Sequence, residues 1–326
     1  MRKLYAVLLT VILLMTASLP ALAQEDAPVR VAGLIGPTGM SLAPMIAKND
    51  AAYAFTLAAA PEELVGDIVA GRFDIAAVPT NLAAVLYNKT KGAVRMLAVN
   101  TLGVLYILEK GDSVQTVGDL QGKTITTAGQ GAVPEYALNY ILEANGIQAD
   151  VVYKSEHNEV SALAASGLAD LVMLPQPMVT ALMMKDDSFR VRVALDLTAE
   201  FSAAAALKGQ QDTVLSMGCM VVRKEFADAH PDRLAAFLDE YAEAIAYVND
   251  KPAKAAVDIA AAGILPNEKI AEQAIPMCNI VYITGEAMKD SIAPLMDILY
   301  QANPNAVGGA VPDDGFYYIV PEEAAP

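Results

Sequence analysis

Two short loops rich in glycine, threonine and amide side chains carry residues that could bind a small molecule. The first contains Gly36-Pro-Thr-Gly39, and the second contains Gly129-Gln-Gly131. Glycine lets a backbone approach a ligand closely, and the first turn of a following helix offers unpaired N–H donors with a partial positive charge. Thr, Asn and Gln add directional hydrogen bonds. Such loops could hold a small anion, or a carbonyl or ring-nitrogen acceptor of a solute.

The candidate ligand-binding residues come from corresponding places in two similar units. The first unit supplies Thr38, Gly39, Met40, Thr80 and Asn81, with Asn100 and Thr101 at the end of a later strand. The second unit supplies Gln130, Gly131, Ala132, His157, Gln176 and Pro177. Each glycine could instead form a simple turn, and Thr80 could serve only as a helix N-cap. Because these loops contain no Arg or Lys, we expect a neutral or singly charged ligand.

A duplicated pattern predicts the elements that position these residues. The segment Gly71-Arg-Phe-Asp-Ile-Ala-Ala-Val-Pro79 recurs as Gly167-Leu-Ala-Asp-Leu-Val-Met-Leu-Pro175 with identical spacing. Each copy predicts a helix that ends at the glycine, a buried strand, and a further helix, over residues 81–88 and 178–184. Upstream, each unit also contains a strand, a glycine-rich turn and a second strand–helix pair. The repeated β-α order predicts parallel strands with helices on both faces.

The duplication predicts an α/β protein with two doubly wound lobes. Residues 28–108 and 217–326 are expected to form the first lobe, and residues 109–216 the second. Apolar strands at Gly103–Leu108 and Met217–Val222 would cross between them as a two-strand hinge, with the ligand cleft beyond the carboxyl ends of the other strands. Further helices are expected near 231–248, 251–262 and 268–274. Residues 303–326, rich in Pro, Gly and Asp, are expected to form a surface tail.

The N-terminus has the pattern of a secretory signal peptide. Arg2 and Lys3 precede an apolar run, and Ala21-Leu22-Ala23 has the small-x-small form of a cleavage site. We expect residues 1–23 to be removed after about Ala23 and the protein to act in the periplasm or outside the cell. A retained anchoring helix is the alternative. The thiol that a lipid anchor requires is missing near this site.

Charge and cysteine content restrict the possible partners. The formal net charge is −16, which disfavours binding to nucleic acid or to anionic membranes. The two cysteines, Cys219 and Cys278, lie in apolar contexts in the middle of the chain. They could form a disulfide in an oxidising compartment or remain as two buried thiols.

These motifs together resemble those of type II periplasmic binding proteins. The group to which the chain is most similar contains the nitrate, sulfonate and taurine receptors and the NMT1/THI5-like receptors for thiamine pyrimidine precursors. The segments that carry the resemblance are Gly36-Pro-Thr-Gly39, Asp74-Ile-Ala-Ala-Val-Pro-Thr-Asn81, Asp119-Leu-Gln-Gly-Lys123, Gly129-Gln-Gly-Ala-Val-Pro-Glu135 and His230-Pro-Asp-Arg-Leu. The resemblance implies a monomeric receptor that delivers a captured solute to the permease and ATPase of an ABC importer.

Two other functions share this fold. A related pyrimidine synthase uses a histidine consumed in the reaction, a lysine that carries pyridoxal phosphate and a cysteine-rich iron site. This chain has two histidines, His157 and His230, two distant cysteines, and no C-x-x-C or H-E-x-x-H spacing. We therefore expect binding without catalysis, cofactor or metal. A ligand-sensing module of a signalling receptor would show the same features and differ only in its partner.

Overall fold

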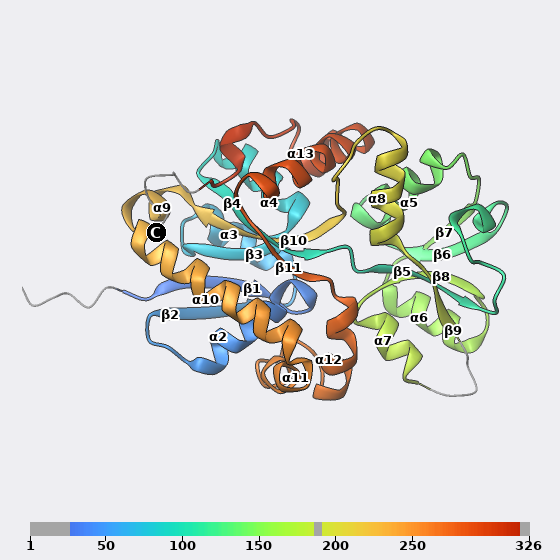
Figure 1. Cartoon of the computed structure of the whole chain (residues 1–326), viewed down its shortest axis with the longest axis horizontal. Coiled ribbons are helices and arrows are strands. Elements are labelled where there is room, and N and C mark those ends of the chain that lie inside the picture. Colours follow the sequence, from blue (N-terminus) through green and yellow to red (C-terminus); the bar gives the residue numbers. More distant parts are fainter. Residues whose placement is uncertain (1–26, 186–190, 320–326) are drawn as a thin grey trace, which may run out of the picture.

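The computed structural model describes residues 27–185 and 191–319. The expected signal peptide, residues 1–23, lies outside the described residues. The chain forms two α/β lobes side by side, each built on its own sheet (Figure 1). In both lobes the carboxyl ends of the parallel strands point toward the other lobe. This arrangement agrees with the predicted fold class.

The sheet of the first lobe has the strand order β11-β4-β10-β3-β1-β2. Its strands are β1 (Val29–Leu34), β2 (Tyr53–Ala58), β3 (Ile75–Pro79), β4 (Val94–Leu102), β10 (Ser216–Arg223) and β11 (Ile280–Ile283). The sheet of the second lobe has the order β7-β6-β8-β5-β9. Its strands are β5 (Leu105–Lys110), β6 (Thr124–Ala128), β7 (Asp150–Lys154), β8 (Leu171–Pro175) and β9 (Val191–Asp196).

Both sheets are mixed, because antiparallel strands join the parallel strands that the repeated units predicted. The duplicated units are parallel, since β1 pairs with β2 and β3, and β6 pairs with β7 and β8. The strands that lead toward or away from the lobe junction are antiparallel to their neighbours: β10 to β3 and β4, and β5 to β8 and β9. A strand that arrives from the other lobe enters the sheet from the opposite end, so its direction is reversed.

Helices cover both faces of each sheet. In the first lobe these are η1 (Pro37–Leu42), α2 (Ala43–Lys48), α3 (Pro61–Val69), α4 (Thr80–Thr90), α9 (Lys224–Ala229), α10 (Pro231–Asp250), α11 (Pro252–Ala261), α12 (Glu268–Ala274), η3 (Ile275–Met277) and α13 (Gly285–Ala302). In the second lobe they are η2 (Val117–Leu120), α5 (Val133–Ala144), α6 (His157–Ser166), α7 (Met178–Met183) and α8 (Leu197–Leu207). Both duplicated glycines have the predicted left-handed conformation, with φ of 69° at Gly71 and 73° at Gly167.

The segment after α13 packs on the first lobe, which corrects the expectation of a surface tail. It contains η4 (Pro304–Val307) and η5 (Asp314–Phe316), and the side chains of Val307 and Phe316 are fully buried. The Tyr318 N–H donates a 2.8 Å hydrogen bond to the Met96 carbonyl on β4. Burial of these apolar side chains outweighs the loop-like composition of the segment, so Val307 and Phe316 join the core of the first lobe and hold the segment against it. The end of the predicted tail, residues 320–326, lies outside the described residues.

The chain passes from the first sheet to the second at Gly103–Val104 and returns between α8 and β10. The Gly103 carbonyl accepts hydrogen bonds from the Thr198 hydroxyl at 2.8 Å and from the Asn279 amide at 2.7 Å. A side chain at Gly103 would collide with Thr198 and Leu215. The crossover is therefore packed closely, and a hinge at this place stays a prediction, as do the residue limits of the two lobes.

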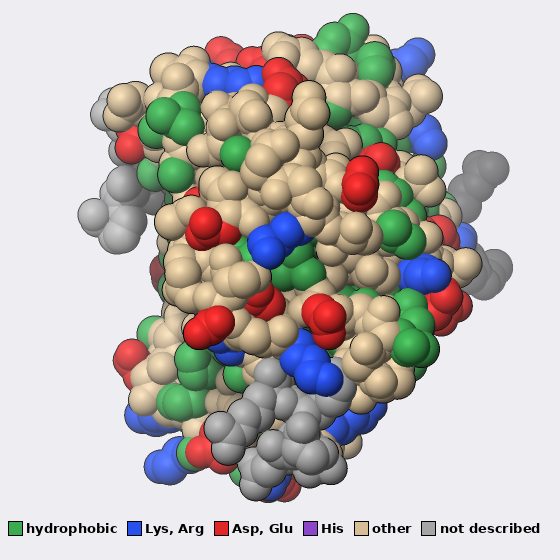
Figure 2. All heavy atoms as spheres, turned by 90° about the vertical axis from the view of Figure 1, so that its right-hand side faces the viewer, with side chains coloured by type: hydrophobic (Ala, Val, Ile, Leu, Met, Phe, Trp, Pro, Cys, Tyr) green, Lys and Arg blue, Asp and Glu red, His purple; other side chains and the backbone are tan. Residues whose placement is uncertain are grey.

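Within the described residues, no helix has both the length and the apolar character needed to cross a membrane. Cys219 and Cys278 are free thiols, and burial raises the pKa of both. Figure 2 looks onto the outer end of the second lobe, where acidic and basic side chains are interspersed.

Candidate ligand-binding site

A buried polar cluster lies at the carboxyl end of the first sheet, beside the lobe junction. The Asn100 amide nitrogen donates to the Thr38 carbonyl at 3.1 Å and to the Tyr241 hydroxyl at 2.9 Å. Its amide oxygen accepts from the Thr101 hydroxyl at 3.0 Å, and Ser41 Oγ lies 2.5 Å from the Tyr241 hydroxyl. Thr38, Asn100 and Thr101 were expected site residues, and the structure brings them together. Tyr241 was not expected, because it is far away in the chain.

A second polar pair lies at the start of α4. Thr80 Oγ1 lies 2.7 Å from Ser216 Oγ, and both residues are buried. Pro79 is the N-cap of α4, so Thr80 is not the cap that the sequence allowed as an alternative. Asn81 turns away from this pair, and its amide nitrogen reaches the Ala306 carbonyl at 3.4 Å. Thr80 therefore faces β10, whereas Asn81 holds the segment after α13.

Gly39 and Met40 are packed inside the first lobe. A side chain at Gly39 would collide with the Leu34 backbone, so the chain needs a glycine for the tight passage from β1 into η1. Met40 is fully buried in the core between the sheet and α10. Neither side-chain position is exposed to a ligand in this structure.

The glycine loop of the second lobe is held by the helix that follows it. Gly129 and Gly131 have φ values of 85° and 76°, and Pro134 occupies the first turn of α5, where its missing N–H costs nothing. The Gly131 N–H donates to Glu135 Oε2 at 2.6 Å, and the Gly131 carbonyl accepts from the Tyr136 hydroxyl at 2.7 Å. The Glu135 carboxylate of α5 thus accepts the hydrogen bond from the Gly131 N–H, a donor that was expected to bind a ligand.

The three residues expected at this loop, Gln130, Gly131 and Ala132, are exposed. Gln176 is buried instead, with its amide oxygen 2.8 Å from the Thr180 hydroxyl that donates to it and its amide nitrogen 3.3 Å from Met277 Sδ in the first lobe. Pro177 follows it through a cis peptide bond and is half-buried. Gln176 therefore sits where the lobes touch.

His157 begins α6 and is half-buried, and its Nδ1 is buried without a hydrogen-bond partner. Burial lowers the pKa of His157 and so favours the neutral imidazole. Tyr153 lies near the end of β7, the strand that precedes α6, and its hydroxyl is also buried. Burial and the nearby Glu135 carboxylate raise the pKa of Tyr153 to about 12. His157 Nδ1 is therefore a polar atom of the second lobe that the described part of the protein does not use, whereas the Tyr153 hydroxyl is near the Glu135 carboxylate.

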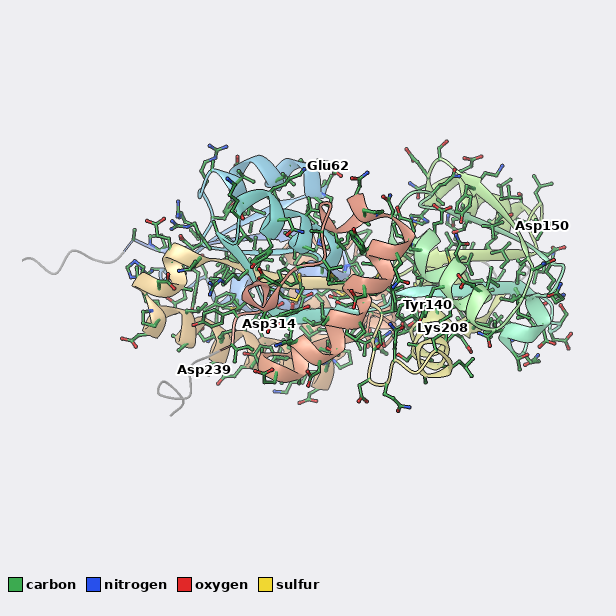
Figure 3. All side chains as sticks on the ribbon, turned by 90° about the horizontal axis from the view of Figure 1, so that it is seen from above. Glu62, Tyr140, Asp150, Lys208, Asp239 and Asp314 are labelled. Atoms are coloured by element: carbon green, nitrogen blue, oxygen red, sulfur yellow. The ribbon has the colours of Figure 1, made fainter. Side chains whose placement is uncertain are left out.

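A cavity of about 810 Å³ opens between the two lobes. Its walls are α5, the segment after α8 and the end of α13, and its lining consists of Gly131, Glu135, Tyr136, Asn139, Tyr140, Glu143, Lys208, Gln210, Ile298, Gln301, Ala302 and Asn303. In Figure 3, Tyr140 and Lys208 lie side by side at the lobe junction. Gly131 is the one expected site residue in this lining. The approach of α13 to α5 is a long-range contact with no local signal in the sequence.

Two α/β lobes that are joined by two chain crossings and share a polar cavity define the class of periplasmic-binding-protein folds. The family model described as "NMT1/THI5 like" matches residues 89–255, about half of the chain. The protein belongs to the NMT1/THI5-like family.

Solved structures share this fold over nearly the whole chain. An ABC transporter structure from Parabacteroides distasonis is 22% identical with a TM-score of 0.76, covering 91% of this chain and 100% of that one. The periplasmic aliphatic sulphonate binding protein SsuA from Escherichia coli is 15% identical with a TM-score of 0.64, covering 90% and 92%. The alkanesulfonate-binding protein SsuA from Xanthomonas axonopodis pv. citri, bound to MOPS, is 16% identical with a TM-score of 0.57, covering 89% and 96%. No curated protein matches the chain.

Proposed function

We propose that this protein is an extracytoplasmic solute-binding protein that captures a small organic solute between its lobes and delivers it to an ABC importer. The observation that carries the proposal is the cavity of about 810 Å³, whose walls come from both lobes. A solute bound there would contact α5 and α13 at once. Binding would therefore favour the state in which the lobes are together, and a transporter could recognise that state.

The cellular setting of the proposal follows from the sequence and the family. Residues 1–23 would direct export and be removed, and the mature protein would act as a monomer with a permease and its ATPase as partners. The similar structures include a periplasmic binding protein, which supports this setting. Of the thirteen expected ligand contacts, Gly131 lines this cavity, and the other twelve stay predictions from the sequence.

The proposed role includes no catalysis and no cofactor. In the described part of the chain, no group of three or more His, Cys, Asp or Glu residues is placed to hold a metal ion. The alternatives of a pyrimidine-synthesis enzyme and of a sensor module are not favoured by a specific observation in the structure.

Mass spectrometry of the protein purified from its native host tests the proposal directly, because a tightly bound solute stays with the protein. Small-angle scattering before and after removal of that solute then measures closure. We expect a bound organic solute and a larger radius of gyration after its removal. A chain that carries no solute, binds none in a thermal-shift screen and keeps the same radius throughout would contradict the proposed function.

A further inference from the structure

Of the three charged side chains that line the interlobe cavity, Lys208 and Glu143 form an ion pair, and Glu135 forms none within the described part of the chain. Lys208 Nζ lies 2.8 Å from Glu143 Oε1 and 5.0 Å from the centre of the Tyr140 ring. The positive charge is therefore already matched by a carboxylate and an aromatic face. The second carboxylate in the lining, that of Glu135, has no cationic partner among the ion pairs of the described residues. The lining thus retains one negative charge.

The helix end at this cavity has its own anion. Glu135 lies in the first turn of α5, where the helix dipole favours a negative charge. Its Oε2 takes the Gly131 N–H at 2.6 Å, which is the backbone donor that an anionic ligand would need. A sulfonate or carboxylate at this place would have to displace Glu135 or lie beside it. An anionic ligand in contact with the Glu135 carboxylate would be repelled by it, and more strongly where water is excluded.

The remaining lining suits a group that donates hydrogen bonds. Tyr136 provides aromatic surface, and Asn139 and Gln301 provide amide carbonyl oxygens. The face of Tyr140 is already taken by Lys208, and the Asn303 side-chain oxygen accepts from the Asn305 N–H. The hydroxyl of Tyr153 lies close to Glu135, and its burial together with that carboxylate raises the pKa of Tyr153. A protonated amine combines well with a carboxylate and with aromatic faces.

We propose that the solute bound in this cavity presents a protonated amine, or an equivalent set of N–H donors, to Glu135, and that organic anions are disfavoured there. This inference rests on the proposed solute-binding function and specifies its ligand. Glu135 would be the residue that distinguishes between amines and anions. The similar SsuA proteins bind sulfonates, and the proposal for this cavity differs from them.

The test compares size-matched probes in thermal-shift and calorimetric titrations. The amines are butylamine and benzylamine, the anions are butanesulfonate and benzenesulfonate, and the neutral compounds are butyramide and benzamide. The solute that co-purifies from the native host is the seventh probe. We expect stabilisation by the amines or by an amine-bearing native solute. Glu135→Gln should weaken that binding about 10- to 100-fold, because it removes a charged hydrogen-bond acceptor.

A matched control is Glu159→Gln, which makes the same change in the first turn of α6, outside the cavity lining. It should leave the affinity unchanged, and unfolding of both variants without ligand verifies that they are folded. Binding of a sulfonate, or of an anionic native solute, to the wild-type protein at least as tightly as the amines, or amine binding that Glu135→Gln leaves unchanged, would overturn the inference and leave the solute-binding function in place. If neither the six compounds nor any co-purified solute binds, both the function and the inference are overturned.

Discussion

The side-chain amide of Asn303, at the end of α13 in the first lobe, donates a 2.8 Å hydrogen bond to the Tyr136 hydroxyl on α5 of the second lobe. The same hydroxyl donates to the Gly131 carbonyl at 2.7 Å. A contact between the lobes and the conformation of the glycine loop therefore share one atom. Separation of the lobes would remove one of the two bonds and leave the other.

We predict a coupling free energy of about 1 kcal/mol between Asn303→Ala and Tyr136→Phe, the usual net contribution of one hydrogen bond. Urea unfolding of the wild type, both single variants and the double variant measures it. Tyr140→Phe is the control for Tyr136→Phe, because its hydroxyl bonds to Gln210 within the second lobe. A coupling near zero between residues 303 and 136 would indicate that the lobes are apart in the ligand-free protein.

Gly218 allows close packing of the polar cluster at the carboxyl end of the first sheet. A Cβ at this position would lie 2.7 Å from Thr38 Oγ1 and 2.8 Å from Asn100 Oδ1. We predict that Gly218→Ala lowers the free energy of unfolding by about 1–3 kcal/mol, measured by urea titration. The control, Gly66→Ala in α3, places its Cβ in open space and should raise stability by about 0.5–1 kcal/mol. Equal effects at both positions would refute the packing argument.

Asp74 stabilises the first lobe as the acceptor of two arginines. Its carboxylate lies 2.6 Å from Arg30 and 2.7 Å from Arg223, and the residue is 5% exposed. Burial alone would raise the pKa of Asp74, but the hydrogen bonds from both arginines lower it below the usual value. Its contribution is therefore present above about pH 4 and is lost as the pH falls through the lowered pKa.

We predict that Asp74→Asn costs about 3 kcal/mol at neutral pH, because it leaves the Arg30 guanidinium without its carboxylate partner and leaves Arg223 with only the exposed Glu225. The difference from the wild type should shrink below about pH 4. Urea unfolding at several pH values measures both effects. Asp67→Asn, in an exposed pair with Arg72, is the control and should not change stability measurably. A cost independent of pH down to pH 2 would contradict the ionic explanation.

Burial of His157 makes the free energy of unfolding depend on pH. The cause is the cost of burying a charged imidazole, whereas at Asp74 it is the attraction to the two arginines. Because its pKa is lowered in the folded protein, the unfolded chain binds a proton more readily. Stability from this residue is therefore complete above about pH 6.5 and decreases as the pH falls below that value. We predict that His157→Gln flattens the dependence of the melting temperature between about pH 7 and pH 5. His230→Gln is the matched control at an exposed histidine, and an equal flattening there would argue against this explanation.

The sequence predicted the elements of the fold well where a local pattern was repeated. The copies that end at Pro79 and Pro175 correctly placed the end of β3 before α4 and the end of β8 before α7. The direction of β10 and the burial of Phe316 could not be predicted in this way. Both depend on contacts between segments far apart in the chain, for which the local residue pattern gives no signal.

The candidate site was predicted less completely for the same reason. Asn100 and Thr38 were placed together by their positions at strand ends, and the structure shows their contact. The wall formed by Ile298 and Asn303 was missed because α13 returns to α5 from the other end of the sequence. The hydrogen bond between Gly131 and Glu135 is local in sequence. It could not be predicted, because a glutamate in the first turn of a helix is also expected for its interaction with the helix dipole alone.

The segregation of strands between the two sheets also bears on how the protein acquires its structure during synthesis. Strands β5 to β9 follow one another in the chain, so the sheet of the second lobe has all its strands once residue 196 has emerged. The first sheet has β10 and β11 in its order, and Tyr318 then bonds to β4. The lobe that begins first along the chain is therefore the last whose sheet can be completed.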